Sequence, residues 1–181
     1  MIILEGADGV GKTTLARKLC QKICEKLGRD PAVEWMHLYG HMSRPRDGFD
    51  HFSDYIPMIR EGVQDRFHLG AMVYGKLLGQ GSYPSSRAMA SLQRYLVWAG
   101  CYTIILTAHR RFLLEKLESS PKSEMYAKDL ILDANDGYRA LAKTCNRGEP
   151  WCDASFDITN GYPCDNDLDE WISTWRIRWT T

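Results

Sequence analysis

The residues with the clearest chemical meaning lie near the amino terminus, where the chain reads Gly6-Ala7-Asp8-Gly9-Val10-Gly11-Lys12-Thr13. This run fits G-x-x-x-x-G-K-[ST], a pattern typical of loops that bind nucleoside triphosphates. Its glycines let backbone N–H groups turn toward phosphate oxygens, and a helix that follows directs its positive end to the same place. We expect Lys12 to bridge the β- and γ-phosphates of ATP and the Thr13 hydroxyl to be a ligand of Mg²⁺. The expected nucleotide-binding residues are Gly6, Ala7, Asp8, Gly9, Val10, Gly11, Lys12, Thr13 and Thr14.

A phosphate loop alone does not identify what receives the phosphate, because kinases, GTPase switches and motors share it. The sequence contains no Asn/Thr-Lys-x-Asp run of the kind that reads guanine, and no long hydrophobic strand that ends in Asp-Glu. We therefore favour a kinase. The non-enzyme alternative is a switch that binds a nucleotide without catalysing phosphoryl transfer.

Charged residues further along the chain suggest how an acceptor would be held. An acceptor that carries phosphate needs arginines, because a guanidinium makes paired hydrogen bonds to phosphate and stays charged. Arg44 and Arg66 have this chemistry, and Asp65 is placed to act on Mg²⁺ through water or on an acceptor hydroxyl. Each has a plainer interpretation: Arg44 as a solvated arginine, and Asp65 with Arg66 as a surface ion pair. The expected catalytic residues are Lys12, Asp65, Arg66 and Asp8, although an Asp-Gly pair is also a common turn.

Aromatic side chains are the natural platform for a nucleobase. The expected candidates are Phe67, Tyr74 and Tyr95, with Gln93 and Arg94 able to read a pyrimidine edge. Aromatic residues on helices are more often part of the core, so each keeps that alternative. We expect His68, which lies beside these residues, to make a structural hydrogen bond rather than to move a proton.

Alternating strands and helices must position these residues. The glycine loop follows a short apolar run, and the helix after it has Leu15, Leu19, Ile23 and Leu27 four residues apart, with a stop at Gly28. The expected strands are residues 1–5, 33–38, 62–65, 102–107 and 155–159. The expected helices are residues 13–27, 52–60, 67–78, 86–98, 110–117, 125–144 and 168–179. This order predicts an α/β P-loop fold with a five-stranded, mainly parallel sheet flanked by helices.

Three segments resemble the thymidylate kinase family. Residues 4–14 are similar to the family's opening, E-G-x-[DE]-x-x-G-K-[ST]-T, and Asp65-Arg66-Phe67 is similar to its Asp-Arg-aromatic segment. A weaker match is Ser43-Arg44-Pro45, and order and spacing agree over roughly the first 110 residues. The resemblance implies that Asp8 contacts the sugar hydroxyl of the acceptor. Because relatives often pair through helices beside the acceptor site, a homodimer is a further expectation.

The chain departs from this family where a mobile lid with arginines is expected. The expected lid, at about residues 118–125, is short, and residues 118–124 contain no arginine. Arg110, Arg111 or Lys116 are left to supply its positive charge. The acceptor is then open between a pyrimidine deoxynucleotide and two alternatives. One is a deoxynucleoside, which needs a carboxylate base such as Asp8 or Asp65.

The other alternative is DNA. Bacteriophage enzymes that phosphorylate 5-hydroxymethyluracil within DNA also look similar to this chain, and Arg44, Arg46 and Arg60 would suit such a substrate. The whole chain has 23 basic and 23 acidic residues, however, which argues against broad electrostatic capture of a polynucleotide.

Length and composition predict one P-loop kinase domain over residues 1–181. No apolar run is long enough for a membrane span, and the first residues lack a signal-peptide pattern. We therefore expect a cytoplasmic protein, in the host cytoplasm if a bacteriophage encodes it, with no membrane partner. The six cysteines lack close Cys-x-x-Cys pairs, so we expect buried or idle thiols and no metal held by cysteine.

Overall fold

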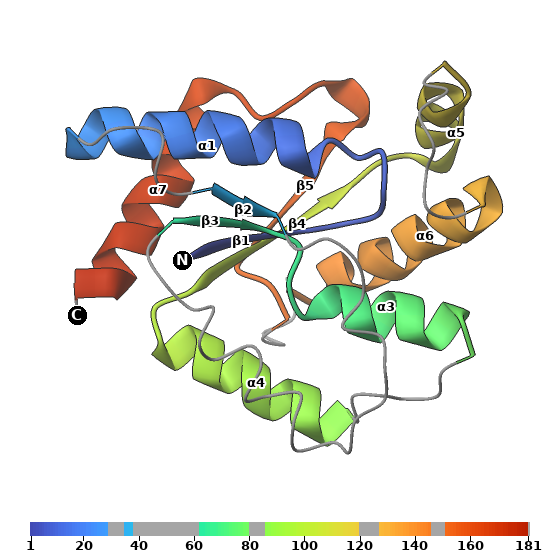
Figure 1. Ribbon diagram of the computed structural model, residues 1–181, viewed down its shortest axis with the longest axis horizontal. Helices are drawn as coiled ribbons and strands as arrows, with labels where there is room; N and C mark the ends of the chain where they lie inside the picture. The colour runs from blue at the N-terminus through green and yellow to red at the C-terminus, as the bar shows by residue number, and fades with distance from the viewer. Residues whose placement is uncertain (29–34, 38–61, 80–85, 120–126, 146–150, 181) are drawn as a thin grey trace.

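A parallel sheet forms the centre of the computed structural model, which describes residues 1–28, 35–37, 62–79, 86–119, 127–145 and 151–180 (Figure 1). Five strands lie in the order β2-β3-β1-β4-β5, and every neighbouring pair is parallel. The strands are β1 (Ile2–Glu5), β2 (Trp35–His37), β3 (Val63–Asp65), β4 (Tyr102–Thr107) and β5 (Ala154–Asp157). The prediction of an α/β fold with a parallel sheet flanked by helices is confirmed.

Helices cover both faces of the sheet (Figure 1). They are α1 (Lys12–Leu27), α3 (Leu69–Leu77), α4 (Ser86–Trp98), α5 (Arg110–Ser119), α6 (Lys128–Cys145) and α7 (Asp165–Thr180), with a 3₁₀ turn at Ile158–Asn160. Helices α1 and α7 lie on one side, and α3, α4 and α6 on the other. None of the helices in the described part of the chain combines the length and apolar character needed to cross a membrane.

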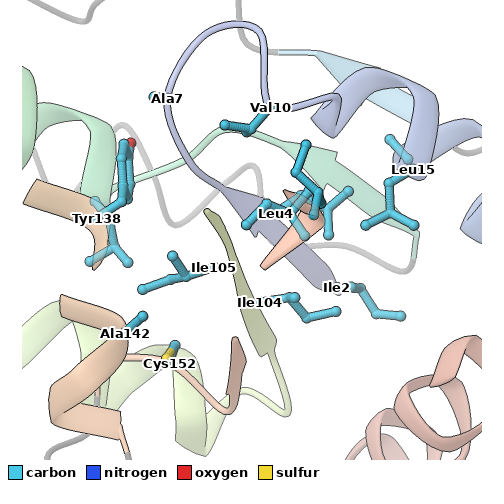
Figure 2. Close-up of a cluster of buried hydrophobic side chains, with 14 of the residues drawn as sticks. Ile2, Leu4, Ala7, Val10, Leu15, Ile104, Ile105, Tyr138, Ala142 and Cys152 are labelled. Carbon is cyan, nitrogen blue, oxygen red and sulfur yellow. The ribbon is translucent and has the colours of Figure 1, made fainter. Parts of the chain in front are cut away.

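The middle strands have no solvent-facing side. All residues of β1 and β4 are buried, as the continuous apolar run in β4 predicts for a sheet covered on both faces. Figure 2 shows Leu4 of β1, Ile104 of β4, Leu15 of α1 and Val10 of the glycine loop as members of one buried cluster. The loop is therefore anchored to the core by its own apolar side chain.

The ends of several elements differ from the predictions by a few residues. Helix α1 stops as expected at Gly28, whose left-handed backbone lets its N–H bond to the carbonyls of Cys24 and Glu25. Helix α3 begins at Leu69 rather than at residue 67, because the amides of Phe67 and Leu69 bond to a side chain of β1. Helix α7 begins earlier than predicted, at Asp165, where Asp167 accepts a hydrogen bond from the Cys164 amide.

The expectation of buried or idle thiols is wrong at one position. Cys152 is disulfide-bonded. Cys20, Cys24 and Cys101 are buried free thiols, and Cys164 is an exposed one. Sequence spacing did not indicate the bond, since it does not show which thiols a fold brings within reach. The expected helix at residues 52–60, the loop with Arg44 and Arg46, Arg60, and most of the expected lid lie outside the described residues.

Candidate functional site

The glycine loop joins the carboxyl end of β1 to the amino end of α1, the strand–loop–helix order that defines a P-loop. Gly11 caps the helix with a left-handed backbone, φ 82°, and its carbonyl accepts the Leu15 amide at 3.1 Å. A Cβ on Gly11 would overlap the Tyr162 hydroxyl, so the exposed Tyr162 side chain would have to move. The left-handed turn therefore favours glycine, and Tyr162 adds a steric cost.

A cavity of about 360 Å³ opens beside this loop. Its lining residues are Asp8, Gly9, Gly11, Lys12, Thr13, Thr14, Arg66, Lys116 and Tyr162. Three of them carry a positive charge, and backbone amides at the start of α1 add partial positive charge. The cavity is thus suited to a polyanion such as a triphosphate.

Lys12 and Thr13 hold ordered positions in this cavity. The buried Lys12 ammonium donates to the carbonyl of Ala7 at 2.6 Å, which keeps it folded against the loop. The Thr13 hydroxyl donates to Asp65 Oδ2 at 2.6 Å. Asp65 is fully buried at the end of β3. The register of β3 beside β1 brings it to the first turn of α1.

The Thr13 and Asp65 oxygens together fit a Mg²⁺ site. Mg²⁺ prefers oxygen donors and is usually held by one or two carboxylates together with phosphates and water. Among the described residues, no group of three or more His, Cys, Asp or Glu side chains could hold a metal by itself. The pair would act as ligands only in combination with phosphate oxygens.

Asp8 and Arg66 also line the cavity and contact each other. The Arg66 guanidinium forms an ion pair with Asp8 through one terminal nitrogen, and its buried Nε has no hydrogen-bond partner among the described residues. The Tyr74 hydroxyl lies 3.4 Å from Asp8 Oδ2 and 3.3 Å from the Asp8 amide. Three of the predicted acceptor residues therefore come together, from the loop, the end of β3 and α3.

Glu5, which the sequence analysis did not single out, lies behind this group. It is fully buried at the end of β1, and one of its oxygens accepts the amides of Phe67 at 3.1 Å and Leu69 at 2.8 Å. The Tyr138 hydroxyl of α6 donates to the other oxygen at 3.2 Å. Burial raises the pKa of Glu5 to about 7, against the opposing effects of these hydrogen bonds and of the Lys12 charge. An acidic residue directly after an apolar run was the available signal.

Other predicted site residues lie away from the cavity. Phe67 is buried in a second core cluster with Leu92 and Leu96. Arg94 is exposed on α4 and bonds to Ser91, and Tyr95 contacts Trp98. Arg44 lies outside the described residues.

His68 has the structural hydrogen bond that the sequence analysis expected. It is fully buried, and its Nε2 lies 2.6 Å from the Gln93 side-chain oxygen. Burial lowers the pKa of His68 to about 4, so the ring is neutral near pH 7. This bond occupies the Gln93 oxygen that was expected to read a base.

Of the three cations considered for the lid, Lys116 is the one that the structure brings to the cavity. Arg110 pairs with Asp133 and Asp136 of α6, and Arg111 pairs with Glu115. Lys116 lines the cavity and donates to the Tyr162 hydroxyl at 3.0 Å. Tyr162 itself was missed, because a lone aromatic residue after the last strand carries no motif.

Solved structures with a similar fold include three chains of low sequence identity. The deoxyadenosine kinase from M. mycoides with bound dATP is 12% identical, with a TM-score of 0.49 over 97% of this chain and 98% of that chain. The same enzyme with bound dCTP is 13% identical, with a TM-score of 0.47 over 98% of this chain and 100% of that chain. A shikimate kinase from Bacteroides thetaiotaomicron is 13% identical, with a TM-score of 0.37 over 98% of this chain and 95% of that chain. No protein-family model matches the sequence, and no curated protein matches it.

Proposed function

We propose that this protein is a P-loop kinase that transfers the γ-phosphoryl group of ATP to a pyrimidine deoxynucleotide, as a deoxynucleoside monophosphate kinase. The observation that carries the proposal is the 360 Å³ cavity on which the glycine loop, Lys12, Thr13, Asp8 and Arg66 converge. We infer that the glycine loop, Lys12 and Thr13 bind the triphosphate, and that Asp8 and Arg66 bind the acceptor.

On the donor side, the loop amides and Lys12 bind and orient the phosphates. The Lys12 ammonium would exchange its bond to the Ala7 carbonyl for phosphate oxygens, so it is already in place when the nucleotide enters. Thr13 and Asp65 would hold Mg²⁺, which neutralises the charge that develops on the phosphates. The burial of Lys12 strengthens its electrostatic effect, because less water screens it.

On the acceptor side, Arg66 and Asp8 bind and align the second substrate. Arg66 lines the cavity while paired with Asp8, and an acceptor phosphate would take hydrogen bonds from its guanidinium. Asp8 keeps an acceptor oxygen near a sugar hydroxyl. In a phosphate acceptor the attacking group is already an anion, so no strong general base is required there.

A deoxynucleoside kinase is the second candidate, because Asp8 is a carboxylate on the cavity wall. A neutral hydroxyl acceptor needs a base, and Asp8 is the carboxylate among the lining residues. Its ion pair with Arg66 holds this carboxylate at the cavity wall. Transfer to 5-hydroxymethyluracil in DNA is the remaining alternative.

A panel assay with γ-labelled ATP separates these functions. The acceptors are free deoxynucleosides, deoxynucleoside monophosphates, and DNA with thymine or 5-hydroxymethyluracil. Our proposal expects label on pyrimidine monophosphates, and loss of that transfer in Lys12→Ala but not in Lys143→Ala, an exposed lysine on α6. Transfer to DNA or to nucleosides alone would replace it with an alternative, and hydrolysis without any acceptor would favour a switch.

A further inference from the structure

Arg66 has an unusual backbone conformation for a residue with a side chain. Its φ is 71°, and it is the one residue other than glycine with a positive φ in the described part of the chain. A left-handed backbone costs an L-residue on the order of 1 kcal/mol. Such a conformation persists where the surrounding structure holds it, and it is found preferentially at functional sites.

Buried groups fix the chain on both sides of Arg66. Its amide donates to the carbonyl of Leu4 at 2.9 Å, and its carbonyl accepts from the Gln64 side chain at 3.1 Å. After Arg66, the amides of Phe67 and Leu69 both donate to the same Glu5 oxygen. The turn of residues 66–69 is therefore held mainly from β1, and most directly by Glu5.

The Glu5 carboxyl is in turn held from a third element. The Tyr138 hydroxyl of α6 donates to its second oxygen, and Figure 2 shows Tyr138 pointing toward the loop that follows β1. Both carboxyl oxygens are thus bonded, with no exposed surface. Burial of a carboxyl costs free energy that its hydrogen bonds must offset, and these same bonds fix where it lies.

We propose that Glu5 is a positioning residue for the acceptor: by binding the Phe67 and Leu69 amides it fixes the turn that directs the Arg66 guanidinium into the cavity. The identity of the acceptor in this inference rests on the proposed function. The positioning of Arg66 by Glu5 does not depend on it. Glu5 does not itself line the cavity, so it acts through Arg66. The chemical class that this arm recognises is a phosphate monoester, whose oxygens would accept hydrogen bonds from the Arg66 guanidinium at the cavity wall.

Replacing Glu5 by residues of similar size separates geometry from charge. Glu5→Gln keeps an oxygen for both amides and presents an N–H₂ to the Tyr138 oxygen. Glu5→Leu fills the space and offers no acceptor. Glu25→Gln is the control, since Glu25 is exposed near the far end of α1. Thymidine 5′-monophosphate is the probe acceptor in steady-state kinetics.

We expect Glu5→Leu to raise the KM for thymidine 5′-monophosphate by roughly tenfold while the KM for ATP changes less than about twofold. Glu5→Gln should stay close to the wild type, as Glu25→Gln should. The inference is overturned if both KM values rise together in Glu5→Leu, if neither rises, or if Glu5→Gln is as impaired as Glu5→Leu. Should Glu5→Leu not fold, Glu5→Asp takes its place, because its shorter side chain cannot reach both amides.

A second readout does not depend on catalysis. The Nε–H resonance of Arg66, followed by NMR during titration with inorganic phosphate, reports the position of the guanidinium. It should shift in the wild type and in Glu5→Gln, and should shift weakly or not at all in Glu5→Leu or Glu5→Asp. The same shift in all four proteins would overturn the inference. A wild type that shows this response but transfers no phosphoryl group would remove the proposed function alone.

Discussion

The donor side of the cavity consists mainly of one run of chain, the glycine loop and the first turn of α1, whereas the acceptor side joins segments that are distant in sequence. Lys12 bonds to Ala7, five residues away. Asp8 contacts Tyr74 across 66 residues, and Glu5 contacts Tyr138 across 133. A local motif can be transferred between proteins, but the acceptor side depends on the whole fold for its geometry.

Asp65 is where the two sides meet, and its substitution should have the largest effect. Asp65→Asn keeps an oxygen for the Thr13 hydroxyl but loses the charge that we propose holds Mg²⁺. We expect turnover to fall roughly a hundredfold or more, with a higher Mg²⁺ requirement. Turnover measured across a Mg²⁺ series tests this, with Asp129→Asn, an exposed residue in the first turn of α6, as the control. An unchanged Mg²⁺ requirement would separate Asp65 from the metal.

Gly11 tests how far the donor side is purely local. Gly11→Ala places a methyl group against the Tyr162 hydroxyl and strains a left-handed backbone. We expect ATP affinity to fall roughly tenfold to a hundredfold, since two penalties of about 1 kcal/mol or more combine. Adding Tyr162→Ala should recover the steric part but not the backbone part. The Kd for ATP is measured by calorimetry. If the double variant regained the full wild-type affinity, or regained none of it, the separation into a steric and a backbone part would be contradicted.

Glu5 on the acceptor side should make the free energy of unfolding depend on pH. Its pKa is near 4.5 in the unfolded chain and is raised by burial to about 7 in the folded protein. Between these values the folded state retains a proton that the unfolded state has released, so this contribution to stability is lost as the pH rises through 7. We expect the free energy of unfolding of the wild type to fall by roughly 2 kcal/mol relative to Glu5→Gln between pH 5 and pH 8.

Urea unfolding of both proteins across this pH range measures the difference, with Glu25→Gln as a control that should parallel the wild type. Parallel curves for wild type and Glu5→Gln would mean that the buried carboxyl does not titrate in this range.

Lys116 should show the smallest effect, because it reaches the cavity from the edge. Lys116→Met removes its charge and its bond to Tyr162 while keeping a long apolar stem. We expect a roughly threefold to tenfold higher KM for ATP, as for a partly exposed charge pair. Arg111→Met should leave the KM unchanged, because Arg111 lies five residues earlier on α5 and pairs with Glu115. Equal effects of both substitutions would indicate a general charge effect instead.

The sequence was informative where structure and function are local. The loop of residues 6–13, the helix with Leu15, Leu19 and Ile23 on its buried face, and the apolar strand β4 were all predicted near their observed bounds. The pairing of Thr13 with Asp65 was not predicted, although both were predicted as metal ligands. The parallel register of β1 and β3 explains how they meet.

The remainder depends on contacts that no local pattern encodes. Glu5 reads as the end of a strand, and its role emerges when the turn of residues 66–69 and Tyr138 are packed around it. Tyr162 reads as a loop residue until the fold places it over Gly11. Phe67 looked like a base platform because it follows Arg66, but the turn directs it into the core cluster with Leu92.

Calorimetric titration of the wild-type protein with a non-hydrolysable ATP analogue and Mg²⁺ tests the central claim most directly. The account predicts one saturable site per chain, with binding greatly weakened in Lys12→Ala and retained in Lys143→Ala. A wild type that releases no heat at millimolar analogue, or that binds it equally well without the Lys12 ammonium, would contradict the assignment of the cavity as a triphosphate site.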